Sequence, residues 1–230
     1  RRRFPYFKDF TQASIDKLLT PEERKSALVL EANYLQSVYV ENTGNGSFVL
    51  HPLPTQAQLA PIFGMVAQDV DRDGNLDVML VGNDFSAELL MGRYDAMNGL
   101  WLKGDGKGGF APQTIASSGF YVPGNAKGLA QLTDAQGRNL LVATQNRGPL
   151  RVFRTRQTDE SVRLQPTDVV ALLTHAQGRT ERVELSYGSS YLSQSDRTLR
   201  IGSTIRRVDI IDSKGKKRMV TPTAKPVAKR

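Results

Sequence analysis

Residues 69 to 77 read Asp-Val-Asp-Arg-Asp-Gly-Asn-Leu-Asp, a dense run of carboxylates whose spacing could bind a metal ion. The aspartates fall at positions 1, 3, 5 and 9 of this stretch: Asp69, Asp71, Asp73 and Asp77. A hard cation such as Ca²⁺ takes roughly six to eight oxygen ligands at about 2.3–2.6 Å, and this spacing wraps four carboxylates and one backbone carbonyl around a point. Gly74, at position 6, permits the sharp turn that this requires. The stretch predicts a metal loop; the alternative is an acidic turn with solvated side chains.

The residues around the loop distinguish it from an EF-hand. An EF-hand loop needs a bidentate Glu at position 12, where this chain has Leu80. The flanking segments "GMVAQ" and "LDVMLVGN" are apolar and strand-like rather than helical. The loop is therefore predicted to join two strands, with an ion that supports the fold rather than performs catalysis.

Other patterns that could indicate catalysis are weaker. Residues 104–109 match G-x-G-x-x-G, but a dinucleotide site needs a helix there and Phe-Ala-Pro follows instead, which favours a hairpin turn. The two histidines, His51 and His175, lie far apart, and neither belongs to a Ser/Asp pattern or an H-E-x-x-H motif. A histidine-based triad or a zinc enzyme is not expected.

The long connection at 83–102 is the candidate ligand-contacting segment. It carries Phe85, Tyr94 and Asp95, which suit ligand contact on an exposed face. Tyr94 could equally be a core residue, and for Trp101 the core interpretation is favoured. A glycoside-hydrolysing carboxylate pair is the enzymatic alternative. Its candidates are Asp84, Glu88, Asp95 and Asp105.

Strand-like segments repeat along the chain. Residues 37–54 and 99–116 align at an offset of 62 residues, with Tyr39 on Trp101 and Phe48 on Phe110. Each of these is predicted to be a β-hairpin, followed by a further strand pair. Recurring units of four strands are typical of propeller blades, and two units with the start of a third are too few to close a propeller. In the second unit residues 133–137 replace the aspartate loop, so no ion is expected there.

The chain is predicted to be organised in four parts. Thr20 before Pro21 predicts the start of a helix. An apolar face for it could come from Ala27, Leu28, Leu30 and Leu35. After residue 159 a second set of short strands is predicted, with turns at Gln177-Gly178 and Lys214-Gly215. The expected boundaries are 1–34 for a helical lead-in, 35–158 for the blades, 159–218 for a small β module and 219–230 for a flexible basic tail.

Composition limits the alternatives. The 230 residues carry a formal charge of +8 and no cysteine, which excludes disulfides and thiol catalysis. No apolar window is long enough to predict a transmembrane segment. The basic residues near the end of the chain could bind a polyanion, but no aromatic residues alternate with them, so a solvated tail is favoured over a specific nucleic-acid site.

The aspartate loop followed by "LDVMLVGN" resembles the calcium-bearing FG-GAP (VCBS-type) repeat of integrin-like β-propellers. Phe63-Gly64 stands where that repeat has Phe-Gly, and "YVENTGNGSF" and "GDGKGGF" are similar to its hairpins. The segments "VELSYGSSYLSQSDRTLRIG" and "RRVDIIDSKGKK" resemble the ASPIC/UnbV module that often follows such repeats in secreted bacterial proteins. Residues 212–215 depart from that module's usual Trp-Pro-Ser-Gly-type turn. The resemblance covers roughly residues 35 to 218.

The resemblance implies an all-β protein: part of a β-propeller with four-stranded blades, a short helical lead-in and a small C-terminal β module. It also implies a structural Ca²⁺, whose ligands are the four aspartate side chains and the Asn75 carbonyl. We expect non-catalytic, adhesion-type binding of a protein or glycan, outside the cell or at a bacterial cell envelope, with further blades upstream. The alternative is a carbohydrate-active enzyme or its accessory module that uses the acidic residues of the 83–102 connection.

Overall fold

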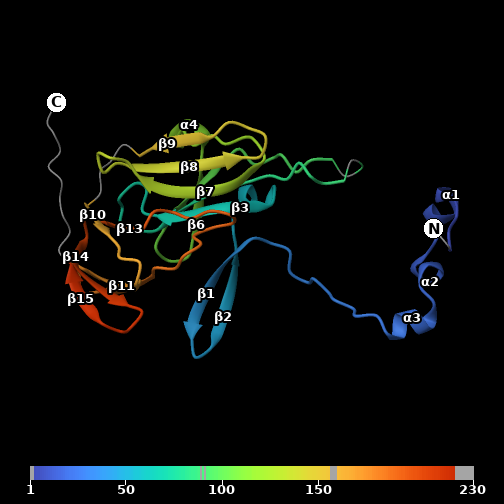
Figure 1. Cartoon of the computed structure of the whole chain (residues 1–230), viewed down its shortest axis with the longest axis horizontal. Coiled ribbons are helices and arrows are strands. Elements are labelled where there is room, and N and C mark those ends of the chain that lie inside the picture. Colours follow the sequence, from blue (N-terminus) through green and yellow to red (C-terminus); the bar gives the residue numbers. More distant parts are fainter. Residues whose placement is uncertain (1–2, 89, 91, 156–159, 221–230) are drawn as a thin grey trace. The chain divides into compact units, whose positions relative to one another are not determined.

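The computed structural model describes residues 3–88, 90, 92–155 and 160–220 of the chain. Strands hold 43% of the residues and helices 10%, which confirms the predicted all-β class. The strands form several small antiparallel sheets, which close into neither a barrel nor a propeller within the described ranges (Figure 1). None of the described helices is long and apolar enough to cross a membrane. The chain divides into two compact units, Arg1–Leu35 and Gln36–Arg230.

The first unit contains three short helices: α1 (Phe7–Thr11), α2 (Ile15–Leu18) and α3 (Pro21–Lys25). The predicted cap at Thr20 is present. Its Oγ1 accepts from the Glu23 amide at 3.2 Å, and its own amide donates to Glu23 Oε2 at 2.8 Å. The expected apolar helix face does not form, because α3 ends at Lys25 and the leucines at 28, 30 and 35 follow it as exposed residues. A five-residue helix makes few hydrogen bonds of its own and needs packing against other residues to continue. The leucines that follow it are exposed, so no packing supports a longer helix here.

The second unit begins with a meander of strands. In chain order these are β1 (Val38–Gly44), β2 (Ser47–Pro52), β3 (Ile62–Gln68), β4 (Asp77–Gly82), β5 (Leu100–Gly104), β6 (Phe110–Gln113), β7 (Ala126–Thr133), β8 (Asn139–Gln145) and β9 (Arg151–Arg154). A 3₁₀ turn, η1 (Thr55–Gln58), precedes β3, and a short helix, α4 (Ile115–Ser118), follows β6. The sheets have the orders β1-β2, β3-β4-β5-β6 and β7-β8-β9. Each predicted hairpin and strand pair is therefore present.

The sheets are offset from the sequence repeat by half a unit. The four-stranded sheet joins the strand pair of the first repeat to the hairpin of the second, through pairs such as Met79↔Trp101 and Leu80↔Leu100. The hairpin of the first repeat, β1-β2, forms a sheet of its own. Burial explains this pairing, because β4 and β5 place most of their side chains in the interior whereas β2 is exposed along most of its length.

The four-stranded sheet is covered on both faces, which accounts for the unbroken apolar run in β4. Met79 and Val81 pack into a cluster shared with β7 and β8. The intervening Leu80 points to the other face and packs with Leu100 and Leu102. Alternate residues of one strand therefore enter two different cores, as expected for a strand buried on both sides.

Gly64 lets the sheets of β3 and β7 approach closely. A Cβ placed on Gly64 would lie 2.6 Å from Val81 Cγ2, 2.7 Å from Leu129 Cβ and 2.8 Å from the Leu129 amide nitrogen. Because one of these atoms belongs to the backbone of β7, any side chain here would force the sheets apart. The Phe-Gly pair quoted for the resemblance thus marks a packing contact between two sheets.

The C-terminal part folds as a small β module. Its strands are β10 (Glu160–Arg163), β11 (Asp168–His175), β12 (Thr180–Glu184), β13 (Thr198–Ile201), β14 (Ile205–Asp212) and β15 (Lys217–Val220), and its sheets have the orders β12-β11-β14-β15 and β10-β13. Both predicted turns are present, with Gly178 and Gly215 at positive φ. Strands β10 and β15 were not predicted. β15 reaches two residues into the range 219–230, and residues 221–230, the rest of the expected tail, lie outside the described residues.

The serine-rich segment Ser190–Asp196 of this module contacts both β3 and β7. Ser190 Oγ accepts from the Met65 amide at 2.9 Å, and Ser195 Oγ accepts from the Gln131 amide at 3.0 Å. The Asp196 amide donates to the Gln131 carbonyl at 2.8 Å. These bonds satisfy backbone groups on strand edges that would otherwise stay open. The segment therefore links two sheets that share a core without sharing a ladder.

We predict that Gly64→Ala lowers the free energy of unfolding by about 1–3 kcal/mol, because the added methyl overpacks the β3–β7 contact. Gly202→Ala is the matched control, since a Cβ there meets no atom within 4 Å. Equilibrium denaturation of both variants measures the difference. Equal stability of the two variants would contradict the close approach at Gly64.

Candidate metal centre

The aspartate loop joins β3 to β4 as predicted. The strands pair in an antiparallel ladder that ends with Gln68 opposite Asp77, so the loop starts and finishes at one edge of the sheet. Arg72 and Gly74 adopt left-handed backbone conformations, with φ of 65° and 89°. Gly74 occupies this region without steric cost, which is the role predicted for it.

Asp77 is the buried member of the loop and is 0% exposed. Its Oδ2 accepts from the Val70 amide at 2.9 Å, and its Oδ1 accepts from the Gly104 amide at 2.9 Å. One carboxylate thus connects the start of the loop, the first residue of β4 and the end of β5. Both bonds come from backbone groups, so they fix the direction in which the carboxylate points.

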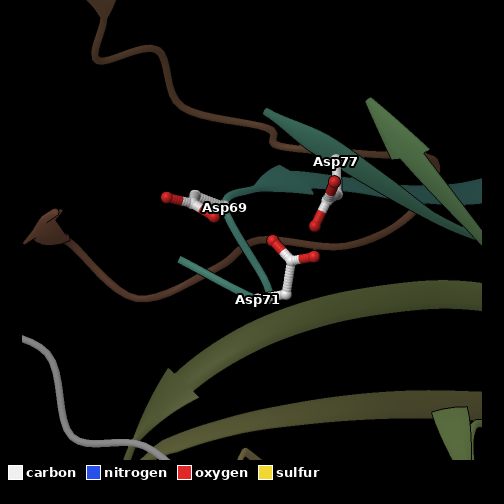
Figure 2. Close-up of side chains that lie close together, drawn as sticks. All are labelled: Asp69, Asp71 and Asp77. Carbon is white, nitrogen blue, oxygen red and sulfur yellow. The ribbon is translucent and has the colours of Figure 1, made fainter. Parts of the chain in front are cut away.

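Asp69, Asp71 and Asp77 lie together, with one oxygen of each within 4.8 Å of the others. Figure 2 shows the carboxylates of Asp71 and Asp77 pointing toward each other, with Asp69 to one side. Asp69 accepts from the amides of Arg72 at 2.7 Å and Gly74 at 3.0 Å, which closes the turn around its side chain. The structure therefore gathers three of the four predicted carboxylates.

The fourth carboxylate, Asp73, is held by a lysine from β5. Lys103 Nζ lies 3.0 Å from Asp73 Oδ2 and also contacts Asp71 Oδ2. Asp73 Oδ1 accepts from the Asn75 amide at 2.9 Å. The Asn75 side chain lies against Gly106, where a Cβ would collide with Oδ1. That the Asn75 carbonyl is a ligand stays a prediction.

Burial raises the pKa of two loop carboxylates, whereas a lysine lowers the pKa of a third. Burial raises the pKa of both Asp69 and Asp77, and the neighbouring Asp71 charge acts in the same direction. The hydrogen bond from Lys103 lowers the pKa of Asp73, and hydrogen bonds to Asp71 and Asp73 raise the pKa of Lys103. A cation beside Asp69 and Asp77 would oppose the effect of burial on their pKa.

The donor set fits a hard divalent cation. Oxygens bound at about 2.3–2.6 Å on opposite sides of a Ca²⁺ ion are separated by roughly twice that distance. One oxygen from each of the three carboxylates lies within 4.8 Å of the other two, which is compatible with this separation. The Lys103 ammonium also shows that a positive charge is accepted beside Asp71. Carboxylate-only coordination suits Ca²⁺ or Mg²⁺ better than zinc or copper.

The corresponding turn of the second repeat holds an arginine. Asp134 follows β7 and pairs with Arg138, whose Nε lies 2.5 Å from Asp134 Oδ2. Asn139 occupies the place of Asp77, because Thr133↔Asn139 closes this ladder as Gln68↔Asp77 closes the first. Hydrogen bonds from the backbone and side chain of Arg138 lower the pKa of Asp134 despite its partial burial. A basic side chain of the loop itself balances the remaining carboxylate.

The predicted ligand-contacting residues lie away from the aspartate group. Tyr94 pairs with Asp84 through two backbone hydrogen bonds of 2.8 and 2.9 Å and is 46% exposed. Phe85 lies beneath the Arg93 guanidinium, 5.0 Å from its ring centroid, and Asp95 is exposed. The bridge closes the connection into a loop that displays these side chains. Trp101 packs against the core, in agreement with its predicted role.

The carboxylates considered for hydrolysis have local structural partners or lie on the surface. Asp84 accepts from the Ser86 amide and hydroxyl and lies 3.5 Å from Lys127 Nζ. Asp105 accepts from the Lys107 and Gly109 amides, which confirms that the G-x-G-x-x-G match is a hairpin turn between β5 and β6. Glu88 is exposed in the same connection.

A cleft of about 990 Å³ separates the loop from the C-terminal module. The loop contributes Asp69 and Asn75, and the module contributes His175 and Glu181. His175 is a buried residue of β11; its Nδ1 lies 3.2 Å from Thr204 Oγ1 and its Nε2 3.1 Å from Glu181 Oε2. Sequence reasoning did not identify this cleft, because its walls come from segments about a hundred residues apart. Lys103 was also missed, since its repeat equivalent is Glu41 and no motif includes it.

We predict that Asp77→Asn lowers the free energy of unfolding by about 1–3 kcal/mol in the presence of a chelator, because one backbone amide loses its acceptor. The control is Asp71→Asn, whose partly exposed ion pair is worth at most about 1 kcal/mol. Denaturation in chelator compares the two. A larger loss for Asp71→Asn would mean that Asp77 does not anchor the loop.

A scan against protein-family models finds no match for this chain, and a search of curated proteins finds none either. Its function must therefore be inferred from its own residues and geometry.

Proposed function

We propose that this chain is a calcium-binding, non-catalytic binding protein built from FG-GAP/VCBS-type repeats and an ASPIC/UnbV-like module. It recognises a protein or a glycan outside the cell or at a cell envelope. The observation that carries this proposal is the gathering of Asp69, Asp71 and Asp77 in a loop between two antiparallel strands. Extracellular calcium is about millimolar, which suits a partly exposed site of this kind.

The strand arrangement supports a propeller as the finer description of the fold. The β3-β4-β5-β6 sheet is a four-stranded antiparallel meander, the form of a propeller blade, and β7-β8-β9 repeats it in part. The β1-β2 hairpin repeats β5-β6 in sequence, but within the described chain β1 pairs with β2 alone. In a complete blade, a further strand pair would join the β1-β2 hairpin, as β3-β4 joins β5-β6. We infer that a preceding repeat supplies that pair.

In this proposal the ion supports the fold. Asp69, Asp71 and Asp77 would hold it, with Asp73 and the Asn75 carbonyl as further ligands from the loop. Bound there, calcium would supply the positive charge that buried carboxylates need and draw the turn closed. Because Asp77 is anchored to the Gly104 amide, closing the turn also stiffens the junction of β4 with β5. A local support of this kind requires no reaction at the site.

Ligand contact is assigned to the exposed connection after β4. Tyr94 offers an aromatic surface, Asp95 a hydrogen-bond acceptor and Phe85 a second ring beside Arg93. Aromatic rings beside carboxylates suit recognition of sugars as well as peptides. The fixed Asp84–Tyr94 bridge orders the loop before a ligand arrives, which lowers the entropic cost of binding.

We expect added CaCl₂ to raise the melting temperature of the chelator-treated protein. At a hundredfold excess over Kd, binding contributes about 2.7 kcal/mol, or a rise on the order of 5 °C for a chain of this size. Asp71→Ala should abolish the rise. Asp134→Ala, in the second loop, should leave it unchanged. A wild-type melting curve that calcium does not move would refute the calcium site.

We further expect glycan-array binding by the intact chain to fall at least about tenfold in Tyr94→Ala and Asp95→Ala, with unchanged melting temperatures. Tyr187→Ala serves as control, because it removes another exposed tyrosine, in the C-terminal module. If the array shows binding that all three variants retain, the ligand does not contact this connection.

A further inference from the structure

An ion pair joins the aspartate loop to β5. Lys103 is the penultimate residue of β5 and reaches across to the loop, where its ammonium contacts Asp71 and lies 3.0 Å from Asp73 Oδ2. Its side chain is 38% exposed, and those of the two aspartates are 27% and 31% exposed. The next residue, Gly104, donates its amide to Asp77. One strand end therefore positions both the buried carboxylate and the ammonium.

Asp71 belongs to two arrangements at once. One of its oxygens lies within the group formed with Asp69 and Asp77, and its Oδ2 contacts the ammonium. The carboxylates of Asp69 and Asp77 each accept two backbone hydrogen bonds, which hold them in place. Asp71 and Asp73 each accept one backbone hydrogen bond through Oδ1, from the amides of Asp73 at 3.2 Å and Asn75 at 2.9 Å, and their Oδ2 atoms contact Lys103. These two Oδ2 atoms can exchange one cation for another.

We propose that Lys103 is a built-in counter-cation that competes with calcium for Asp71 and Asp73, so that the ion must displace its ammonium to complete the site. This inference rests on the proposed calcium function and concerns its regulation. Without calcium the single charge of the lysine is shared between two of the four loop carboxylates, and with calcium those two carboxylates turn to the ion. The lysine lowers the affinity of the site and keeps the loop formed when calcium is scarce.

The second repeat supports this interpretation. Its loop retains one carboxylate, Asp134, and pairs it with Arg138 only four residues away. There a basic side chain balances the carboxylate within the loop. In the first loop the basic side chain comes from the neighbouring strand and faces more carboxylates than it can neutralise, because one ammonium contacts two of four. A divalent ion in place of the ammonium would neutralise two carboxylate charges of the first loop instead of one.

Calorimetric titration with CaCl₂ tests this on the whole chain after chelation, comparing wild type with Lys103→Met and Lys103→Arg. Methionine keeps the length of the side chain and removes its charge, whereas arginine keeps the charge. Loss of two exposed ion pairs predicts that Lys103→Met binds calcium about three- to tenfold more tightly. Lys103→Arg should bind no more tightly than wild type. In chelator, Lys103→Met should melt below wild type, and calcium should raise its melting temperature by more.

The outcomes separate the two proposals. Calcium binding by wild type with equal or weaker binding by a folded Lys103→Met would overturn the role of Lys103 and leave the calcium function intact. Absence of binding by both proteins would overturn the calcium function itself. If Lys103→Met does not fold, Lys103→Gln replaces it, with circular dichroism confirming the fold. Tighter binding by either neutral variant supports the proposal.

Discussion

The buried carboxylate of Asp77 is the contact on which the local architecture depends. It accepts backbone hydrogen bonds from Val70 and Gly104, so it joins the aspartate loop to β4 and β4 to the end of β5. A carboxylate removed from water is costly unless its oxygens are bonded and its charge is balanced. Backbone amides meet the first requirement, and the cation proposed for the loop would meet the second. At least one carboxylate of the loop, that of Asp77, is therefore part of the sheet structure and not a solvated surface group.

Two close contacts extend this arrangement from one sheet to the next. Gly64 allows β3 to approach the backbone of β7, and the segment Ser190–Asp196 bonds to backbone groups of both strands. The sheets share a core without sharing a ladder, so their relative position depends on packing and on this segment. The C-terminal module is thereby attached to both sheets, and its residues and those of the loop line the cleft between them.

Much of this could be predicted from local sequence patterns. The hairpins, the strand pairs, the loop with its glycine and the Thr20 cap all depend on residues close together in the chain. Sheet membership could not be predicted, because hairpin and strand pair alternate along the chain and either grouping satisfies the repeat. The burial of β4 and β5 favours the grouping in which these two strands pair. The pairing of Asp73 with a lysine could not be predicted either, because Lys103 lies thirty residues away in a different strand.

The two loops differ in how they balance charge, and this bears on function. In both, the last ladder position holds a polar residue, Asp77 in one and Asn139 in the other, so the β7-β8 ladder closes without a carboxylate even though the first loop is anchored by one. A catalytic centre would need a carboxylate free to exchange protons with a substrate. Within the group, Asp69 and Asp77 are bonded to the backbone and Asp71 to a lysine. These constraints favour holding a cation in place. In the proposed arrangement the ammonium must leave for calcium to bind, so the lysine sets how much calcium is needed to fill the site.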